Sequence, residues 1–288
     1  SRGGIVPRSI WDDVGGNQDG LYDFLSLDFK KEFFSNPKPV KYIKRMVQIA
    51  TKKDAQDIVV DFFAGSGTTA QSVLELNKQD GGNRKAHLIQ LSEKTSEDSE
   101  AYKANYKSIA DICKDRTRRV NKKIKEEVEA QPDLFKDKPL DLGFKVFTLE
   151  PSNFKVWRTD VIETEEELKK QMNVFVDPVR VRSEADDMAW EILLKSGYEL
   201  TTPMERIELA GTPIYSIADG ELMLILELVK QEAIDALIAR KSASVEGQTP
   251  ADRPKRVICL DRLFAGNDQL KTNTVLQMKD AGIEFRTI

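Results

Sequence analysis

The sequence predicts an α/β protein in which a parallel, helix-covered sheet is followed by a second, smaller α/β or α+β domain. The chain has 288 residues, which corresponds to about two domains at roughly 150 residues each. Its N-terminal half carries two short apolar strands separated by a helical segment, and this order is typical of parallel sheets. The C-terminal part alternates helical and strand-like segments after a polar stretch that contains prolines.

The composition excludes several classes of protein. Hydrophobic residues make up 40% and charged residues 32% of the chain, and Lys plus Arg (44) against Asp plus Glu (48) gives a net charge of −4. This is the composition of a globular protein. The longest apolar run, residues 222–226, is far shorter than the ~18 residues of a membrane span. No apolar leader opens the chain, so we expect a cytoplasmic protein without a membrane partner.

The cysteines and the histidine indicate neither a metal site nor a histidine-based catalytic triad. Cys113 and Cys259 are too few for a disulfide framework, and with a single histidine they lack zinc-site spacing. His87 stands in the apolar strand 86–89, where we expect a buried or structural side chain rather than a catalytic one.

The predicted elements follow in order along the N-terminal part. Residues 1–36 are expected to be irregular, because glycines and prolines interrupt them and no periodicity is present. Pro37-Lys38-Pro39 is expected to open a helix, because proline is tolerated in a first turn and Val40, Ile43 and Val47 recur at helical spacing. Further elements are a strand at 58–63, a helix from about 70 to 76, a second strand at 86–91 and a long helix at 99–129. We assign residues 37–136 to the first domain.

The second domain is expected to span residues 137–288, after a linker at 131–143. Thr164 and Glu167 form a capping-box pattern ahead of a short helix. The other predicted elements are a strand at 144–149, a helix at 185–195, a hairpin of 205–209 with 214–217, a helix at 229–240, a polar loop at 242–254, a strand at 257–260, a helix at 268–281 and an edge strand at 285–288.

The segment that carries chemistry lies between the first strand and its helix. It reads Asp61-Phe62-Phe63-Ala64-Gly65-Ser66-Gly67-Thr68-Thr69. A bend at this place puts backbone N–H groups and the positive end of a helix at the carboxyl edge of the sheet, where ligands bind. Gly65 and Gly67 have no Cβ atom, so a ligand can approach their backbone closely.

The carboxylate of Asp61, rather than the glycine spacing, indicates which ligand would bind at this bend. A phosphate-binding P-loop needs a lysine that is absent here. The dinucleotide fingerprint accepts alanine at position 70, so spacing alone leaves a dinucleotide open. Asp61 would repel a pyrophosphate but could bind the ammonium group of an amino-acid moiety, which favours S-adenosylmethionine. The alternative interpretation is a turn that only connects strand to helix.

The ordered set of motifs resembles a known family. Residues 61–69 resemble the cofactor motif of the amino-methylating DNA methyltransferases, and residues 34–39 resemble the motif that precedes it in their β-ordered group. Five further segments look like the modification subunit of type III restriction–modification systems: 83–93, 115–119, 143–147, 152–157 and 260–268. The resemblance covers nearly the whole chain.

This resemblance implies a partial Rossmann-like sheet that binds S-adenosylmethionine, and it implies roles for individual residues. Asp61 would bind the methionine amino group, and Phe62 would lie near the adenosine or the target base. Glu93 is the candidate for the ribose hydroxyls, with Gln90 as its rival. The other implied cofactor residues are Asn36 and Lys38 on the carboxylate side and Gly65, Ser66, Gly67 and Thr68 in the bend.

The family's catalytic motif, Asp/Asn/Ser-Pro-Pro-Tyr/Phe, does not occur in this chain, because no two prolines are adjacent. That motif holds a base flipped out of the duplex, and in the β order it precedes the cofactor motif. Since the chain starts at Ser1, we expect it to be the C-terminal portion of a longer subunit, with no catalytic residues and no activity alone. The resemblance implies adenine-N6 methylation of double-stranded DNA, with a second modification subunit and a restriction subunit as partners.

Several alternatives remain open from the residues. Residues 103–125 are locally basic, which is compatible with DNA contact or with a solvated helix face. Residues 137–288 are expected to serve in assembly or in docking a partner. Asp261, Asn267, Asp268 and Asn273 are interpreted as helix caps and turns rather than a metal site. A different function, a non-catalytic nucleotide-binding or assembly module, would bind ATP better than S-adenosylmethionine.

Overall fold

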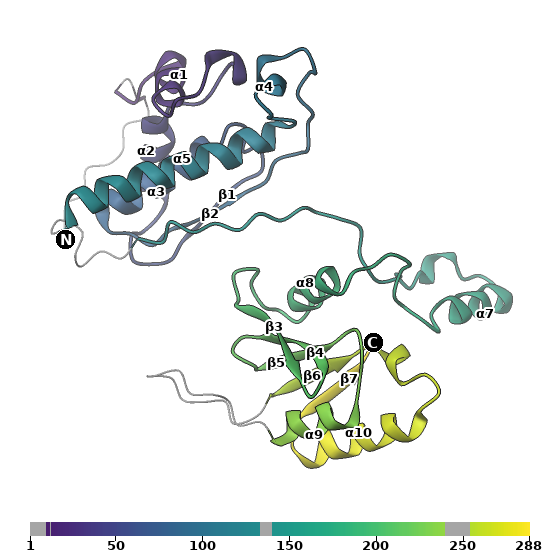
Figure 1. Ribbon diagram of the computed structural model, residues 1–288. Coiled ribbons are helices and arrows are strands. Elements are labelled where there is room, and N and C mark those ends of the chain that lie inside the picture. Colours follow the sequence, from purple (N-terminus) through teal and green to yellow (C-terminus); the bar gives the residue numbers. More distant parts are fainter. Residues whose placement is uncertain (1–9, 12, 133–139, 240–253) are drawn as a thin grey trace. The chain divides into compact units, whose positions relative to one another are not determined.

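The computed structural model describes residues 10–11, 13–132, 140–239 and 254–288. The chain divides into two compact units, residues 1–144 and residues 145–288. Both combine helices and strands, so the α/β class predicted from the sequence is confirmed (Figure 1).

The first unit is built on two parallel strands, β1 (Ile58–Asp61) and β2 (Lys85–Leu88). The helix α3 (Thr68–Asp80) connects them, and α2 (Val40–Ala50) packs on α3. Inward-facing side chains of the strands contact a small core under these two helices. This core contains Val47, Val73 and Leu76, with Val59 and Ala86 packed against it.

The long helix α5 (Ile109–Ala130) packs across α3 and also shares a core with α1 (Asn17–Leu25) and the chain that follows α1. The core between them buries Phe24, Leu27, Phe29, Ile112, Val120 and Ile124. A short 3-10 turn, η1 (Lys31–Phe33), and the one-turn helix α4 (Glu100–Lys103) complete this side.

Two predicted elements of the first unit differ from the structure. Residues 17–25 were expected to be irregular but form α1. At its start the Gly16 N–H donates to the Asp19 carboxylate at 2.6 Å, and the Asp19 N–H donates to the Gly16 carbonyl at 3.0 Å. The helix expected at 99–129 is broken into α4 and α5. Asn105 takes a positive φ of 71° between them, and the Ser108 hydroxyl caps the first turn of α5. Both causes are local hydrogen bonds that hydrophobic periodicity does not report.

One face of the β1–β2 pair is uncovered by the described residues. Val59 faces the helices, whereas Ile58, Val60 and Ile89 point away from them and are exposed. His87 is exposed on the same strand pair, so the prediction of a buried histidine was wrong. Parallel sheets ordinarily have both faces covered, and a two-stranded sheet is marginal by itself.

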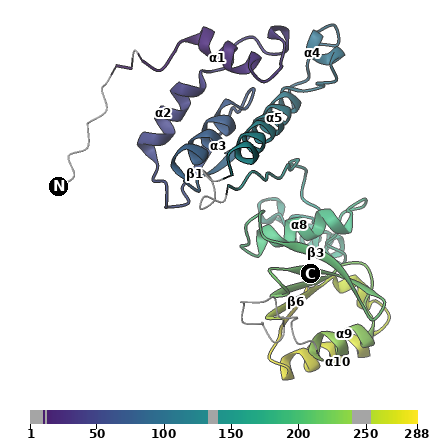
Figure 2. The ribbon, with the colours of Figure 1, turned by 60° about the vertical axis from the view of Figure 1, so that its left-hand side comes forward.

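The second unit contains one five-stranded sheet in the order β3-β4-β5-β6-β7. The first three strands pair antiparallel and the last three pair parallel. Their bounds are β3 (Met204–Leu209), β4 (Thr212–Ile217), β5 (Leu222–Ile225), β6 (Arg256–Cys259) and β7 (Glu284–Thr287). Helix α8 (Ala185–Lys195) covers one face, and α9 (Gln231–Ala239) and α10 (Asp268–Asp280) cover the other (Figure 2).

Most predicted elements of the second unit are confirmed, including the hairpin β3–β4 and the edge strand β7. The capping box of Thr164 and Glu167 starts α7 (Glu165–Val174) as expected. Short 3-10 turns lie at η2 (Thr159–Val161) and η3 (Asp261–Phe264).

Residues 144–149, by contrast, form no strand, and Leu149 is exposed. Strand β5 was not predicted, because its apolar run is buried on both faces and does not alternate. Residues 133–139 of the expected linker and 240–253, which contain most of the expected polar loop, lie outside the described residues.

None of the helices in the described part of the chain combines the length and the apolarity that a membrane crossing requires.

Candidate functional site

The candidate site is the carboxyl end of β1 and the bend that follows it. Asp61 is the last residue of β1 and is half-buried. One of its carboxylate oxygens accepts a hydrogen bond from the Phe63 N–H at 3.0 Å, and the other accepts one from the Thr69 hydroxyl at 2.5 Å. These two bonds hold the carboxylate at the sheet edge, between the strand and the first turn of α3.

The bend itself depends on two glycines with left-handed backbone. Gly65 has φ 52° and Gly67 has φ 83°, and the Gly67 N–H donates to the Ala64 carbonyl at 2.8 Å. A Cβ atom on Gly67 would lie 3.0 Å from Cys113 Sγ. The bend therefore rests on α5, and burial there raises the pKa of the Cys113 thiol to about 11.

The end of β2 supports the bend from the side. The Gln90 side-chain oxygen accepts a hydrogen bond from the Gly65 N–H at 2.8 Å. The Ala64 N–H donates to the Ile89 carbonyl at 3.1 Å. Gln90 thus shapes the bend in this structure. Its implied role on a ribose stays a prediction, and its side-chain NH2 group could donate to a ribose hydroxyl while the oxygen holds Gly65.

The structure also brings the segment 34–39 to the bend, through Phe34. A Cβ atom on Gly65 would lie 3.3 Å from the end of the Phe34 ring. Asn36 and Lys38, two residues implied to contact the cofactor, follow directly and are exposed. Glu93 is exposed in the loop after β2, where its backbone carbonyl accepts a hydrogen bond from the Ile109 N–H at 3.1 Å.

The side chains of Ser66 and Thr68 are buried and point away from solvent, toward α5. Arg116 donates from one terminal nitrogen to the Ser66 hydroxyl at 2.8 Å and to the Thr68 hydroxyl at 2.9 Å. Both residues can therefore offer a ligand their backbone N–H groups, in line with a bend that wraps a cofactor. Phe62 and Phe63 are 65% and 85% exposed, so two aromatic rings stand free beside Asp61.

Arg116 is a residue of this region that sequence reasoning assigned to the wrong class. It was counted in the basic segment 103–125, yet its side chain is 0% exposed and cannot touch a DNA phosphate. A signal was present in the sequence. Arg116 stands four residues after Ile112 and four before Val120, which puts it on the buried stripe of α5.

The Arg119 side chain also makes contacts within the first unit. It pairs with Asp115 at 2.9 Å, donates to the Leu27 and Asp28 carbonyls, and lies over the Phe29 ring at 4.1 Å. Burial, together with the hydrogen bond to Asp115, raises the pKa of Tyr106 beside this pair to about 12. Neither interpretation of the basic segment, DNA contact or a solvated helix face, holds for the buried Arg116, whereas Arg119 is only partly buried and its contact with DNA stays a prediction.

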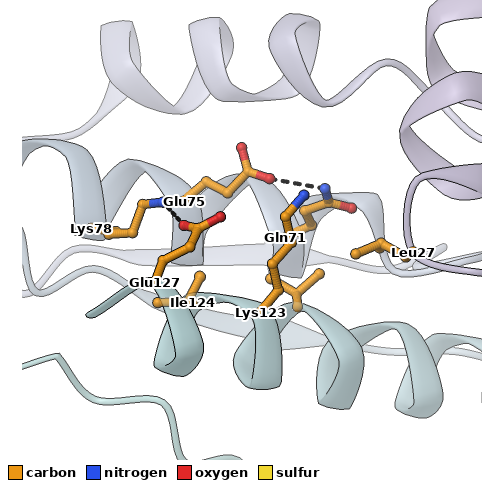
Figure 3. Close-up of a pocket in the computed structure, with 8 residues that line it drawn as sticks. Leu27, Gln71, Glu75, Lys78, Lys123, Ile124 and Glu127 are labelled. Carbon is orange, nitrogen blue, oxygen red and sulfur yellow. Dashed lines mark hydrogen bonds and ion pairs between the residues drawn. The ribbon is translucent and has the colours of Figure 1, made fainter. Parts of the chain in front are cut away.

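A separate hollow lies between α3 and α5 (Figure 3). Lys78 pairs with Glu127 across it, and Gln71 donates to Glu75 at 2.9 Å along α3. Its lining contains none of the residues implied to bind a cofactor. For this reason we regard the sheet edge, rather than this hollow, as the candidate site.

The described residues of the second unit show no comparable constellation. Asn267 caps α10 by accepting a hydrogen bond from the Leu270 N–H at 3.0 Å, and Asp261 pairs with Lys271. The interpretation as a helix cap is confirmed for Asn267, and Asp261 opens the 3-10 turn η3, whereas Asp268 and Asn273 lie within α10. Across the described ranges, no group of three or more His, Cys, Asp or Glu side chains is placed to hold a metal ion.

Comparison with known proteins gives the family. A family model described as DNA methylase matches residues 4–100. The chain is 31% identical over 245 residues to the EcoP15I Mod subunit of Escherichia coli, a type III restriction-modification enzyme. The matched residues make up 85% of this chain and 33% of that protein. It is 34% identical over 273 residues to the EcoPI Mod subunit of Escherichia phage P1, and these residues make up 94% of this chain and 38% of the relative.

A third relative, the StyLTI Mod subunit of Salmonella typhimurium, is 39% identical over 142 residues, covering 49% of this chain and 20% of the relative. The chain thus spans about a third of the length of the first two relatives. All three relatives are Mod subunits of type III restriction-modification enzymes. The residues matched by the family model include the strand–bend–helix segment at Asp61. The chain belongs to the methyltransferase (modification) subunits of type III restriction–modification systems.

Proposed function

We propose that the first unit binds S-adenosylmethionine as the cofactor-binding part of a site-specific DNA adenine-N6 methyltransferase. The observation that carries this proposal is the Asp61 carboxylate, held beside the glycine bend and the N-terminus of α3. An anionic group at this place disfavours a polyphosphate and favours a cationic amino group. The parallel β1–α3–β2 unit supports a Rossmann-like arrangement.

The residues around the bend fit this cofactor by their chemistry. The cofactor, when bound, supplies a methyl group activated by a positive sulfur. Asp61 would accept hydrogen bonds from its ammonium group, and the N–H groups of the bend would face its carboxylate. Phe62 offers an exposed ring for the adenine or the target base. Asn36, Lys38 and Glu93 are proposed to complete the site from the neighbouring loops.

The Asp61→Asn variant tests this proposal. Asparagine keeps the shape and one acceptor oxygen but removes the charge, so we expect S-adenosylmethionine to bind about 10- to 100-fold more weakly, the range of a lost charge-assisted hydrogen bond. Isothermal titration calorimetry measures this directly. The matched control is Asp57→Asn near the opposite end of β1, where the Asp57 carboxylate accepts a hydrogen bond from the Lys52 N–H at 2.7 Å.

The same titration with ATP separates the alternatives. If ATP binds more tightly than S-adenosylmethionine, or if Asp61→Asn and Asp57→Asn have equal effects, the cofactor proposal is wrong. Tighter ATP binding would instead support the nucleotide-binding regulator.

We further propose that the chain alone does not methylate DNA. No two of its prolines are adjacent, so the motif that holds the target amine is absent from these residues. The uncovered face of β1–β2 supports the same view, because further strands and helices of a longer subunit would cover it.

We therefore expect no transfer of tritiated methyl groups from S-adenosylmethionine to double-stranded DNA by this polypeptide, in a preparation that binds the cofactor by calorimetry. Measurable transfer would show that the catalytic groups are present after all.

The second unit is proposed to serve in assembly, with a second modification subunit or a restriction subunit as the partner. The segment before the sheet supports this, because Val176 and Val181 are exposed, as is Leu149. The domain boundary at 136/137, the adenine target and the cytoplasmic location remain predictions from the resemblance and the composition.

A further inference from the structure

Arg116 combines full burial, a positive charge and an incomplete set of partners. Its Nε donates to the Gln71 side-chain oxygen at 2.8 Å, and one terminal nitrogen donates to Ser66 and Thr68. The other terminal nitrogen is buried and has no hydrogen-bond partner among the described residues. The guanidinium lies 5.5 Å from the centre of the Phe24 ring.

The carboxylates nearest to Arg116 are engaged elsewhere. Asp23 accepts a hydrogen bond from the Val40 N–H at 2.8 Å, and Glu75 bonds to Gln71 and pairs with Lys44 at 3.3 Å. Burial lowers the pKa of Arg116 to about 10, while the charges of Asp23 and Glu75 act in the opposite direction. The guanidinium therefore stays charged at neutral pH. Buried charges are normally paired, because burying an unpaired one costs much free energy.

The position of this charge is informative. Arg116 bonds to the side chains on both sides of Gly67, so the cation lies directly under the bend and the first turn of α3. The N-terminus of α3 carries a partial positive charge of its own. On the strand side, Asp61 carries a negative charge. After burial, this charge is a further cause that raises the pKa of the Cys113 thiol, which packs under Gly67. The bend is thus positive underneath and negative at one side.

This charge pattern matches a zwitterion. An ammonium group fits Asp61, and a carboxylate fits the positive N–H groups over Arg116, whereas a polyphosphate would satisfy the second and be repelled by the first. We propose that Arg116 is a positioning residue that orients the bend through Ser66 and Thr68 and makes the site prefer a ligand that carries a carboxylate. This rests on the proposed function, since the carboxylate is that of the amino-acid part of S-adenosylmethionine.

The test compares two ligands that differ only in that group, S-adenosylmethionine and decarboxylated S-adenosylmethionine. Calorimetry with the full chain is expected to show wild-type preference for the first by about tenfold, the value of one charge-assisted contact. Arg116→Met, which keeps the length without the charge, should abolish most of this preference while changing the affinity for the decarboxylated ligand little. Arg116→Lys, which keeps the charge, should retain the preference.

If Arg116 has only a structural role, Arg116→Met should weaken the binding of both ligands equally and leave the ratio of the two affinities unchanged. That outcome, or a wild-type protein that binds both ligands equally well, would overturn the inference but not the proposed function. If the wild type binds neither ligand, the proposed function fails as well. Should circular dichroism show that Arg116→Met does not fold, a folded Arg116→Lys protein without the preference contradicts the inference.

Discussion

The Gly20→Ala variant is expected to destabilise the first unit, although alanine is ordinarily about 1 kcal/mol better than glycine inside a helix. Gly20 lies in α1, where the helix backbone meets residues 37–39. A Cβ atom there would lie 2.1 Å from the Pro37 carbonyl oxygen and 2.8 Å from the Pro39 nitrogen. Both are backbone atoms, so the two segments must separate. We expect a net loss of about 1–3 kcal/mol, the usual range for overpacking.

Gly20→Ala should also weaken cofactor binding, because the displaced residues 37–39 include Lys38 and directly follow Asn36 in the segment that begins with Phe34 at the bend. Urea unfolding followed by circular dichroism measures the stability, and calorimetry measures the affinity. Gly16→Ala is the matched control on the same helix, since nothing lies within 4 Å of a Cβ atom there. Equal effects of the two changes would show that α1 does not position this segment.

The Gly67→Ala variant is expected to lose cofactor affinity by at least about tenfold and stability by more than 1 kcal/mol. Two costs combine at this residue. Its φ of 83° is left-handed, which costs a residue with a Cβ atom about 1 kcal/mol. The added atom would also lie 3.0 Å from Cys113 Sγ and 3.2 Å from the Cys113 carbonyl oxygen. The bend must move off α5, and the N–H groups that would face the ligand move with it.

Gly197→Ala separates these two costs. Gly197 has nearly the same backbone, with φ 86°, but nothing lies within 4 Å of a Cβ atom there. Its variant should show the backbone cost alone in thermal unfolding and should bind S-adenosylmethionine like the wild type. If Gly67→Ala retains full affinity, the bend is not part of the cofactor site.

The elements that were predicted correctly are those specified by local patterns. The strand–bend–helix segment at 58–76 follows from an apolar run, two glycines and helical spacing. The Thr164–Glu167 box and the β3–β4 hairpin follow from capping and turn residues. The failures also have local or packing causes. Strand β5 is buried on both faces and has no alternation, and residues 144–149 alternate but form no strand with the described residues.

The candidate site was predictable in part. Asp61 and the bend of Gly65 and Gly67 lie together because neighbours in sequence must lie together at a strand end. The sequence alone also indicated the family, since its motifs occur in a fixed order along the chain. The contribution of Gln90 to the bend depends on the pairing of β1 with β2, because its oxygen meets Gly65 across that pair.

Only the tertiary structure decided what the charged residues of α5 do. Arg116 and Arg118 are two positions apart and look alike in the sequence, yet the first is fully buried under the bend and the second is exposed. The amphipathic period of α5 places them on different sides of the helix. Which side meets α3 depends on contacts between residues far apart in the chain. A local pattern therefore determines the shape of the bend, and long-range packing determines the charge beneath it.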